Sequence, residues 1–425
     1  MFGALPAAKL ESTAVDDLVK AMAGAPAIGD NPAIPAGFTY LAQFIDHDIT
    51  FDPTSQLQKR NDPDALVNFR TPRLDLDSLY GAGPADQPYL YEWDNADDRS
   101  IKLLVVDDDL PRNGQGLALI GDPRNDENLI LAQLHLLFVR FHNRVVDRVR
   151  AERGLAGAAL LLEAQRIVRW HYQWIVGHDF LRRIVGHEMH GMSYRWPGDP
   201  FIPVEFSGAA YRFGHSMVRG AYKMNRRTAE HPVAIFAPVE DPESPDLVGF
   251  RHVPSDLRIE WEFFFTLKAD TAPQRSRRID TSLSGPLFHL PAAISPEREA
   301  LARLNLRRGW ALGLPSGRDV ALAMGVEPLS DEELQLDTVK KRSVDALRSA
   351  PPLWYYVLCE ASTEKGGNEG LHLGPVGARI VLEVLTGLLD GDPNGYRRRW
   401  PAWSPELPRA KPDDFTMADL INFTG

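Results

Sequence analysis

Apolar residues recur along much of the chain at spacings of three and four positions, which is the repeat of helices with one buried face. This pattern predicts helices over 14–23, 40–51, 163–185, 353–361 and 375–388. Strand-like alternation is scarce. The segment 236–258 is rich in Pro, Asp and Val and is consistent with a short hairpin or an extended excursion.

The segment 40–51 places one histidine between two carboxylates inside an apolar run. On a helix, Asp46 and His47 follow Gln43 by three and four positions, so these side chains share one face. Asp48 is turned by about 100° from His47 and faces a different neighbour. Charges in apolar surroundings need partners, so one helix can serve two sites. The alternative is an ordinary core histidine bonded to a nearby aspartate.

A second oxygen-rich stretch follows the first. Thr71, Asp75 and Asp77 recur at even spacing, so an extended loop would point their oxygens in one direction, and the Arg73 carbonyl can join them. Calcium takes six to eight oxygen ligands, and Asp48 would supply the carboxylate that ties this loop to the preceding helix. The alternative is a solvated acidic turn.

A third polar group opens the apolar run that ends near residue 145. Asp122 is a good N-cap and Pro123 suits the first helical position, so we expect a long helix to begin here. Arg124, Glu127 and Asn128 would then share one face at its start. The alternative is a capped surface helix with an internal ion pair.

Two further sites stand out downstream. His215 follows Arg212 by three residues and has a glycine beside it, which suits an imidazole offered to a flat group close to the backbone. Asn305 lies among leucines, where an amide normally has a fixed hydrogen-bond partner. A buried, satisfied histidine is the alternative for His215.

Composition narrows the classes of partner. Lys and Arg number 47 against 58 Asp and Glu, and this net charge of -11 argues against nucleic acid or an anionic membrane as the main partner. A single cysteine, Cys359, excludes an intrachain disulfide framework. The start lacks the features of a signal peptide, and no apolar run approaches the roughly 20 residues of a membrane span. We therefore expect a soluble protein, cytoplasmic or exported without a leader.

These motifs, taken together and in order, resemble those of the animal-type haem peroxidases in the peroxidase-cyclooxygenase superfamily, in particular the compact bacterial branch. The resemblance runs from about residue 37 to about residue 388. It implies a mainly α fold, a single large helical domain with very little β structure. We expect residues 1–36 to wrap the surface of one structural unit formed by residues 37–425.

The resemblance implies a haem b cofactor with its distal side on the first helix. Gln43 and His47 would line the distal pocket, Arg124 would be the distal catalytic arginine, and Asp46 and Glu127 would form esters to the haem. His47 would move protons between the peroxide oxygens.

On the proximal side, the resemblance makes His215 the iron ligand, with Asn305 accepting a hydrogen bond from its other ring nitrogen. Arg212 and Arg308 would lie near the haem propionates. The implied Ca²⁺ ligands are Asp48, Thr71, the carbonyl of Arg73, Asp75 and Asp77.

The function implied is reduction of hydrogen peroxide with oxidation of small anionic or aromatic donors. Some relatives carry a methionine that links to the haem where this chain has Asn128, so bromide, iodide and thiocyanate are expected over chloride. Fatty-acid oxygenation is the alternative within the superfamily, although Arg212 occupies the position of the radical-forming tyrosine and Tyr211 is displaced by one residue.

Two alternatives come from other classes. A His-Asp metal-dependent hydrolase also begins with adjacent histidine and aspartate, but His135, His142 and His171 do not obviously supply its further ligands. A non-enzymatic scaffold protein fits less well with His47, Arg124 and His215 all present. The sequence does not fix the oligomeric state or the physiological electron donor.

Overall fold

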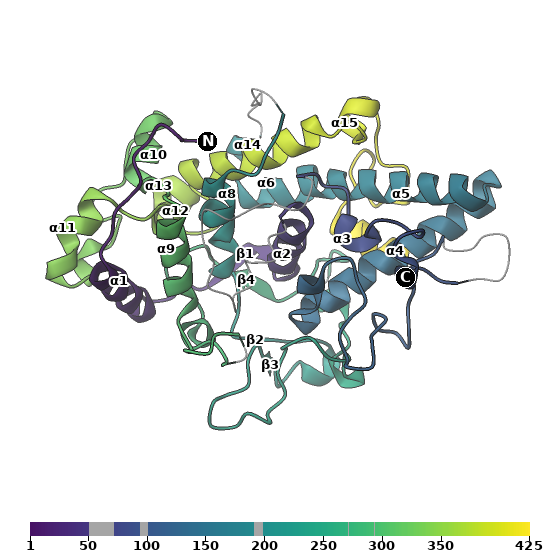
Figure 1. Ribbon diagram of the computed structural model, residues 1–425, viewed down its shortest axis with the longest axis horizontal. Helices are drawn as coiled ribbons and strands as arrows, with labels where there is room; N and C mark the ends of the chain where they lie inside the picture. Colours follow the sequence, from purple (N-terminus) through teal and green to yellow (C-terminus); the bar gives the residue numbers. More distant parts are fainter. Residues whose placement is uncertain (51–71, 94–100, 191–198, 271, 293) are drawn as a thin grey trace.

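The computed structural model describes residues 1–50, 72–93, 101–190, 199–270, 272–292 and 294–425 (Figure 1). The expected calcium ligand Thr71 lies outside the described residues. No described helix is both long enough and apolar enough to cross a membrane.

Helices account for most of the regular structure. Those of the first half of the chain are α1 (Ser12–Gly24), α2 (Gly37–Ile49), α3 (Asp77–Tyr80), α4 (Leu129–Arg153), α5 (Gly157–Trp174), α6 (Leu181–Ile184), α7 (His187–His190) and α8 (Val204–Gly208). Those of the second half are α9 (Leu301–Ala311), α10 (Gly317–Ala323), α11 (Lys341–Ser349), α12 (Leu353–Ser362), α13 (Glu364–Gly367), α14 (Pro375–Gly391), α15 (Tyr396–Arg399) and α16 (Met417–Thr424).

Strands are few and short. β1 (Asp30–Pro35) pairs with β4 (Arg275–Arg277), and β2 (Ala221–Tyr222) pairs with β3 (Val233–Ala234), both antiparallel. The prediction of a mainly helical chain with very little β structure is confirmed. The segment 236–258 forms no hairpin of its own, because its four prolines remove backbone donors.

Helix α2 lies in the interior, where it packs against α4, the short 3-10 helix η5 (Ala210–His215) and the β1–β4 pair (Figure 1). Its ring Phe44 stacks on Phe138 of α4 at 4.6 Å between centroids and meets the edge of Tyr172 from α5 at 6.1 Å. All three side chains are fully buried. This aromatic contact fixes the helix that carries the proposed catalytic histidine.

The start of α4 differs from the expectation. Asp122 caps only a single 3-10 turn, η3 (Pro123–Asp126), by accepting a hydrogen bond from the Arg124 amide. The long helix begins at Leu129, after Asn128 caps it by accepting from the Leu131 amide at 2.8 Å. Two cap residues in succession therefore divide the segment that the apolar pattern presents as one helix.

The helix expected over 163–185 is also interrupted. Between α5 and α6, residues Ile175–Phe180 form a π-helical turn, η4. A β-carbon on Gly177 would lie 3.3 Å from Leu389 and 3.1 Å from Arg397, so the glycine permits close approach of α14 and the segment after it. A mid-helix glycine was the available sequence signal.

The N-terminal segment is tied to the rest of the chain at several points. Helix α1 packs against α9 and α11, and Asp17 pairs with Arg342 at 2.7 Å. Strand β1 continues the segment into the interior of the molecule (Figure 1). The division at residue 36 stays a prediction.

Candidate active site

His47 is held on α2 by a side chain from the next motif. Its Nδ1 lies 2.8 Å from Oδ1 of Asn125, and both residues are buried. An amide oxygen only accepts hydrogen bonds, so Nδ1 carries the ring proton and Nε2 keeps its lone pair. Burial lowers the pKa of His47 to about 4, and the positive charge of Arg124 adds to this, so the ring is neutral near pH 7.

A second histidine fixes the amide from the other side. Nδ2 of Asn125 lies 3.0 Å from Nδ1 of His135, a residue of α4 that is 1% exposed. The amide nitrogen only donates, so the buried chain His47–Asn125–His135 has one consistent direction. Sequence reasoning missed Asn125 and considered His135 as a possible ligand of a metal-dependent hydrolase. The one available sequence signal was an amide residue that follows Arg124 in a turn with a capping residue.

Arg124 is bound to the same end of the distal helix. Its guanidinium contacts both carboxylate oxygens of Asp122, at 3.1 and 2.8 Å, and Nη2 donates to the His47 carbonyl at 3.1 Å. It also donates to the carbonyl of Thr50. The positive charge is therefore held at the C-terminal end of α2, where it acts electrostatically on the His47 imidazole.

Glu127 and Asn128 meet the distal helix at Gln43. Nε2 of Gln43 donates to the Glu127 carboxylate, and Asn128 donates to Oε1 of Gln43 at 3.3 Å. Burial raises the pKa of Glu127 to about 7, against the lowering effect of Arg124. Gln43 and Glu127, which are 84 positions apart in the sequence, therefore form one polar cluster together with Asn128.

The residues expected on the proximal side of the haem lie around η5. Asn305 of α9 has its Nδ2 2.8 Å from Nδ1 of His215, and its Oδ1 accepts from Nη1 of Arg212 at 3.2 Å. The sequence-based expectation had the amide oxygen facing His215. The guanidinium of Arg212 reverses this, because a guanidinium can only donate.

Electrostatic interactions relate the residues on α2 to the residues around η5. Helix α2 packs against η5, and the Asp46 carboxylate acts electrostatically on Tyr211 and Arg212 of η5. Burial and the neighbouring charge of Arg308 lower the pKa of Arg212 to about 10. Asp46 therefore faces the segment that presents His215.

Asp48 points to a separate cluster, as its helical position predicts. Ligand oxygens of Asp48, Asp75 and Asp77 all lie within 4.8 Å of one another. Asp48 also accepts from the Leu76 amide and the Ser78 hydroxyl, each at 3.2 Å. Arg73 lies in the same described loop. Three carboxylates this close form a donor set suited to a hard cation with oxygen ligands.

The histidines that a metal-dependent hydrolase would need have other partners. His142 bonds to the Tyr80 hydroxyl at 3.1 Å and to the Ile101 carbonyl at 2.8 Å. His171 bonds to the Ile167 carbonyl at 2.7 Å. Within the described part of the chain, the one acidic or histidine cluster of metal-binding geometry contains no histidine, so this alternative loses its support.

The donor chemistry of the central site fits a haem. His215 offers an imidazole, and Arg212 and Arg308 bring two guanidiniums together in the interior, which suits a pair of carboxylates such as the propionates. Glu127 places a carboxylate beside Gln43, and Asp46 of the same helix as Gln43 brings a second carboxylate toward η5. Gln43 and His47 of one motif and His215 of another thus meet around one interior region.

Comparison with known proteins agrees with this geometry. A sequence model described as animal haem peroxidase matches residues 53–392. Chorion peroxidase of Drosophila melanogaster is 29% identical over 288 residues, covering 64% of this chain and 34% of that protein. Thyroid peroxidase of Sus scrofa is 26% identical over 377 residues, covering 78% of this chain and 38% of that protein. The chain thus spans little more than a third of the length of these relatives.

Solved structures show the same fold. Peroxidase A from Dictyostelium discoideum superposes with a TM-score of 0.60 at 18% identity, covering 90% of this chain and 84% of that one. Fatty acid alpha-dioxygenase from Oryza sativa superposes with a TM-score of 0.59 at 17% identity, covering 91% and 78%. At these identities the likeness concerns the fold alone.

Proposed function

Because this chain belongs to the animal haem peroxidase family, we propose that it is a haem-dependent peroxidase that reduces hydrogen peroxide and oxidises small donors. The observation that supports this most directly is the neutral His47, whose ring direction is fixed by Asn125 and whose position is opposite the His215 segment. That arrangement supplies a proton acceptor on one side and an iron ligand on the other.

Haem would be held by residues from the distal region around α2 and from the proximal region around η5. His215 would bind the iron, Arg212 and Arg308 the propionates, and Asp46 and Glu127 would form the ester links. When bound, the haem would supply the two electrons that cleave the peroxide O–O bond. Iron bound at Nε2 of His215 would leave the ring proton on Nδ1, so the Asn305 amide oxygen would accept from Nδ1 as well as from Arg212.

His47 and Arg124 would carry out the distal proton and charge transfers. Nε2 of His47 accepts a proton from one peroxide oxygen and returns it to the other as water departs. Asn125 keeps Nδ1 protonated, so that Nε2 is the atom that both accepts the proton and returns it. The Arg124 guanidinium, fixed by Asp122, stabilises the negative charge that develops on the leaving oxygen.

Calcium is proposed for the cluster beside the distal helix. Asp48, Asp75 and Asp77 would bind it together with Thr71 and the Arg73 carbonyl. Because Asp48 follows His47 directly on α2, the cation would fix the helix against the loop and so hold the imidazole in place. Calcium would thus affect catalysis only by holding the His47 imidazole in position.

The environment of Asn128 supports the proposed donor preference. Its Oδ1 caps α4 and its Nδ2 donates to Gln43, so it has a structural role where a methionine link to haem would otherwise form. Without that link we propose bromide, iodide, thiocyanate and aromatic reductants as donors, with chloride disfavoured. Efficient chloride oxidation at neutral pH would contradict the preference.

An absorption spectrum of the protein expressed with added haem tests the main proposal. We expect a Soret band that changes when hydrogen peroxide is added and returns as iodide or a phenol is oxidised. Apoprotein that stays colourless after haem supplementation, with haem taken up normally by a known peroxidase expressed in parallel, would refute it.

Fatty-acid oxygenation is the second candidate, favoured by one observation. The Tyr211 hydroxyl is buried with no hydrogen-bond partner among the described residues, while its ring stacks on Phe206 at 4.6 Å. A buried tyrosine without a partner, electrostatically coupled to Asp46, is a candidate radical site. Oxygen uptake with a polyunsaturated fatty acid that disappears in Tyr211→Phe would establish this activity, and no uptake by the haem-loaded protein would exclude it.

A further inference from the structure

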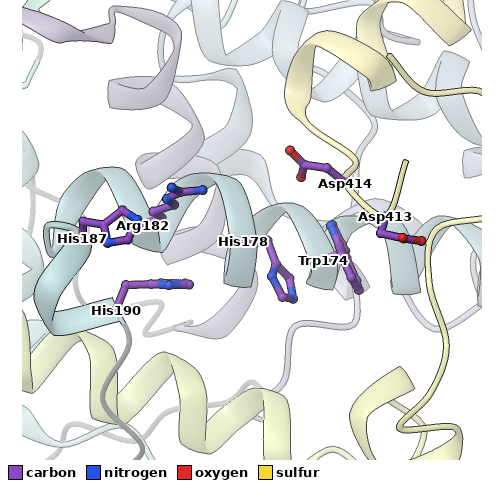
Figure 2. Close-up of a pocket in the computed structure, with 7 residues that line it drawn as sticks. All are labelled: Trp174, His178, Arg182, His187, His190, Asp413 and Asp414. Carbon is purple, nitrogen blue, oxygen red and sulfur yellow. The ribbon is translucent and has the colours of Figure 1, made fainter. Parts of the chain in front are cut away.

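A cavity of about 360 Å³ opens on the outer side of the π-helical turn η4. Trp174 and His178 form its aromatic wall, with ring centroids 3.9 Å apart and planes inclined by 20° (Figure 2). Arg182, His190 and Asp414 also line it, so both signs of charge are available around the rings. An aromatic wall with a few polar groups suits a ring compound that carries a hydroxyl or amino substituent.

Beneath this wall lies a cluster of oxidisable rings. Trp174 contacts Tyr396 at 5.7 Å and Trp403 at 5.9 Å, and Tyr396 contacts Trp403 at 5.3 Å. Trp170 extends the cluster, 5.4 Å from Trp403. Indole and phenol are the side chains that lose a single electron most readily. The cavity therefore gives a bound molecule direct access to a chain of redox-active groups.

Tyr396 has the hydrogen bonds that a redox-active tyrosine needs. Nε of Arg397 lies 3.3 Å from its hydroxyl oxygen, and a guanidinium only donates. The hydroxyl proton is therefore directed to Nε2 of His178, 3.1 Å away. Burial lowers the pKa of His178 to about 4, which leaves its imidazole neutral and able to accept that proton. The Tyr396 phenol releases its proton as it loses an electron, and His178 is already in place to accept that proton.

The cluster lies one helix away from the proposed haem site. The turn η4 packs directly on α2, and a helix with its side chains is about 10–12 Å across. On α5, Tyr172 lies between Trp170 and Trp174 in sequence and contacts Phe44, which follows Gln43 on α2. Tyr172 faces the other way from Trp170 and Trp174 on α5, so an electron leaving the cluster crosses this one helix to reach α2 and the distal side of the haem pocket.

We propose that the cavity at Trp174 and His178 is a second oxidation site, which takes phenolic donors too large to enter the haem pocket. The inference rests on the proposed peroxidase function, which supplies the oxidant. Tyr396 gives one electron to the peroxide-oxidised protein while its hydroxyl proton moves to His178. A phenol in the cavity then returns an electron to Tyr396, the proton moves back from His178, and the phenol releases its own proton. Two phenols thereby reduce one peroxide to two waters.

Donors of the same chemistry but different size test this site. Free tyramine and tyramine coupled by a short amide link to dextran present the same phenol, and only the free form is small enough for the haem pocket. We expect the haem-loaded wild-type protein to oxidise both. Trp174→Phe and Tyr396→Phe should lose dextran–tyramine oxidation by about tenfold or more and keep free tyramine oxidation within about twofold.

Trp400→Phe is the matched control, because Trp400 is 58% exposed and lies four residues after Tyr396. It should leave both rates unchanged. An independent measurement is electron paramagnetic resonance of samples frozen after peroxide addition. We expect a tyrosyl signal in the wild type that is missing from Tyr396→Phe.

The outcomes separate the two proposals. If the wild type oxidises free tyramine and not dextran–tyramine, or if both cluster variants oxidise both donors at the wild-type rate, the second site is overturned and the peroxidase function stands. If a variant loses both donors equally, the cluster serves the structure and the second site is again overturned. If the wild type oxidises neither donor, both proposals fall.

Discussion

Oδ1 of Asn125 lies 2.8 Å from Nδ1 of His47 and thereby decides which nitrogen of the proposed catalytic histidine is the base. His135 holds the amide from behind at 3.0 Å, so the direction of the pair is fixed without any charged group in the chain. In the proposed function the buried amide of Asn125 would be a positioning residue, which acts on peroxide through His47.

Asn125→Ala should slow the reaction with hydrogen peroxide by about tenfold or more, since a base with the wrong tautomer cannot accept the proton. Stopped-flow absorption at the Soret band measures this rate. A second reading comes from ring ¹⁵N shifts of His47 in the diamagnetic carbon monoxide adduct, which report the position of the ring proton. The exposed Asn422→Ala is the control, and an unchanged peroxide rate in Asn125→Ala would contradict the role.

Removal of calcium should lower both the thermal midpoint and the peroxide rate, because Asp48 and His47 are neighbours on α2. We expect chelation to reduce both and added Ca²⁺ to restore both, with the haem still bound. Asp75→Asn should mimic chelation by weakening the ligand set. Asp108→Asn, which removes an exposed carboxylate paired with Arg140 and Arg258, should not. Activity that survives complete calcium removal would count against the site.

Covalent attachment of the haem is expected through Asp46 and Glu127 after exposure to peroxide. Acid–acetone extraction should leave the haem with the protein, and mass spectrometry of the digested wild type should find it on both peptides. Glu127→Gln should keep the Asp46 link alone, and the double variant with Asp46→Asn should release all of its haem. Complete extraction of haem from peroxide-treated wild type would refute the esters.

Acid should destabilise the fold in a window set by buried histidines. His142 is fully buried, and burial lowers its pKa from 6.5 to about 4. The unfolded chain therefore binds a proton in that interval that the folded chain does not, so stability is complete above about pH 6.5 and falls as the pH decreases toward 4. Each such histidine contributes about 1.4 kcal/mol per pH unit across the window.

Urea unfolding of the apoprotein at several pH values measures this slope. His142→Gln should reduce it by the contribution of about one proton, because glutamine keeps polar contacts without titrating. The exposed His252→Gln serves as the control. Equal slopes for the wild type and His142→Gln would show that His142 is already protonated or already accessible in the native state.

Side-chain spacing predicted the parts of the site that depend on a single element. Asp46, His47 and Asp48 point where a helix would direct them, and Asp48 meets Asp75 and Asp77 as the calcium hypothesis requires. These inferences need only the geometry of one helix and the proximity of the following loop. The mainly helical fold followed from the family resemblance and is confirmed.

The parts that sequence could not supply depend on how separate elements meet. The Asn125 amide acquires its direction from His135 on α4, and the Asn305 amide acquires the opposite of its expected direction from Arg212. His178 and Tyr396 are 218 positions apart and pair only because Gly177 lets the α14 region approach the π-helical turn. No periodicity encodes such contacts.

The contacts of Asp122 restrict the conformational entropy of the Arg124 side chain. The Asp122 carboxylate accepts from the Arg124 amide at 2.9 Å, and both of its oxygens accept from the guanidinium of the same residue. One carboxylate therefore fixes both ends of a long side chain. The rotamer freedom of that arginine is therefore lost when the chain folds and not when peroxide arrives. In the proposed reaction, the pocket would meet each peroxide molecule with its cation already immobile, and turnover would require no ordering of that side chain.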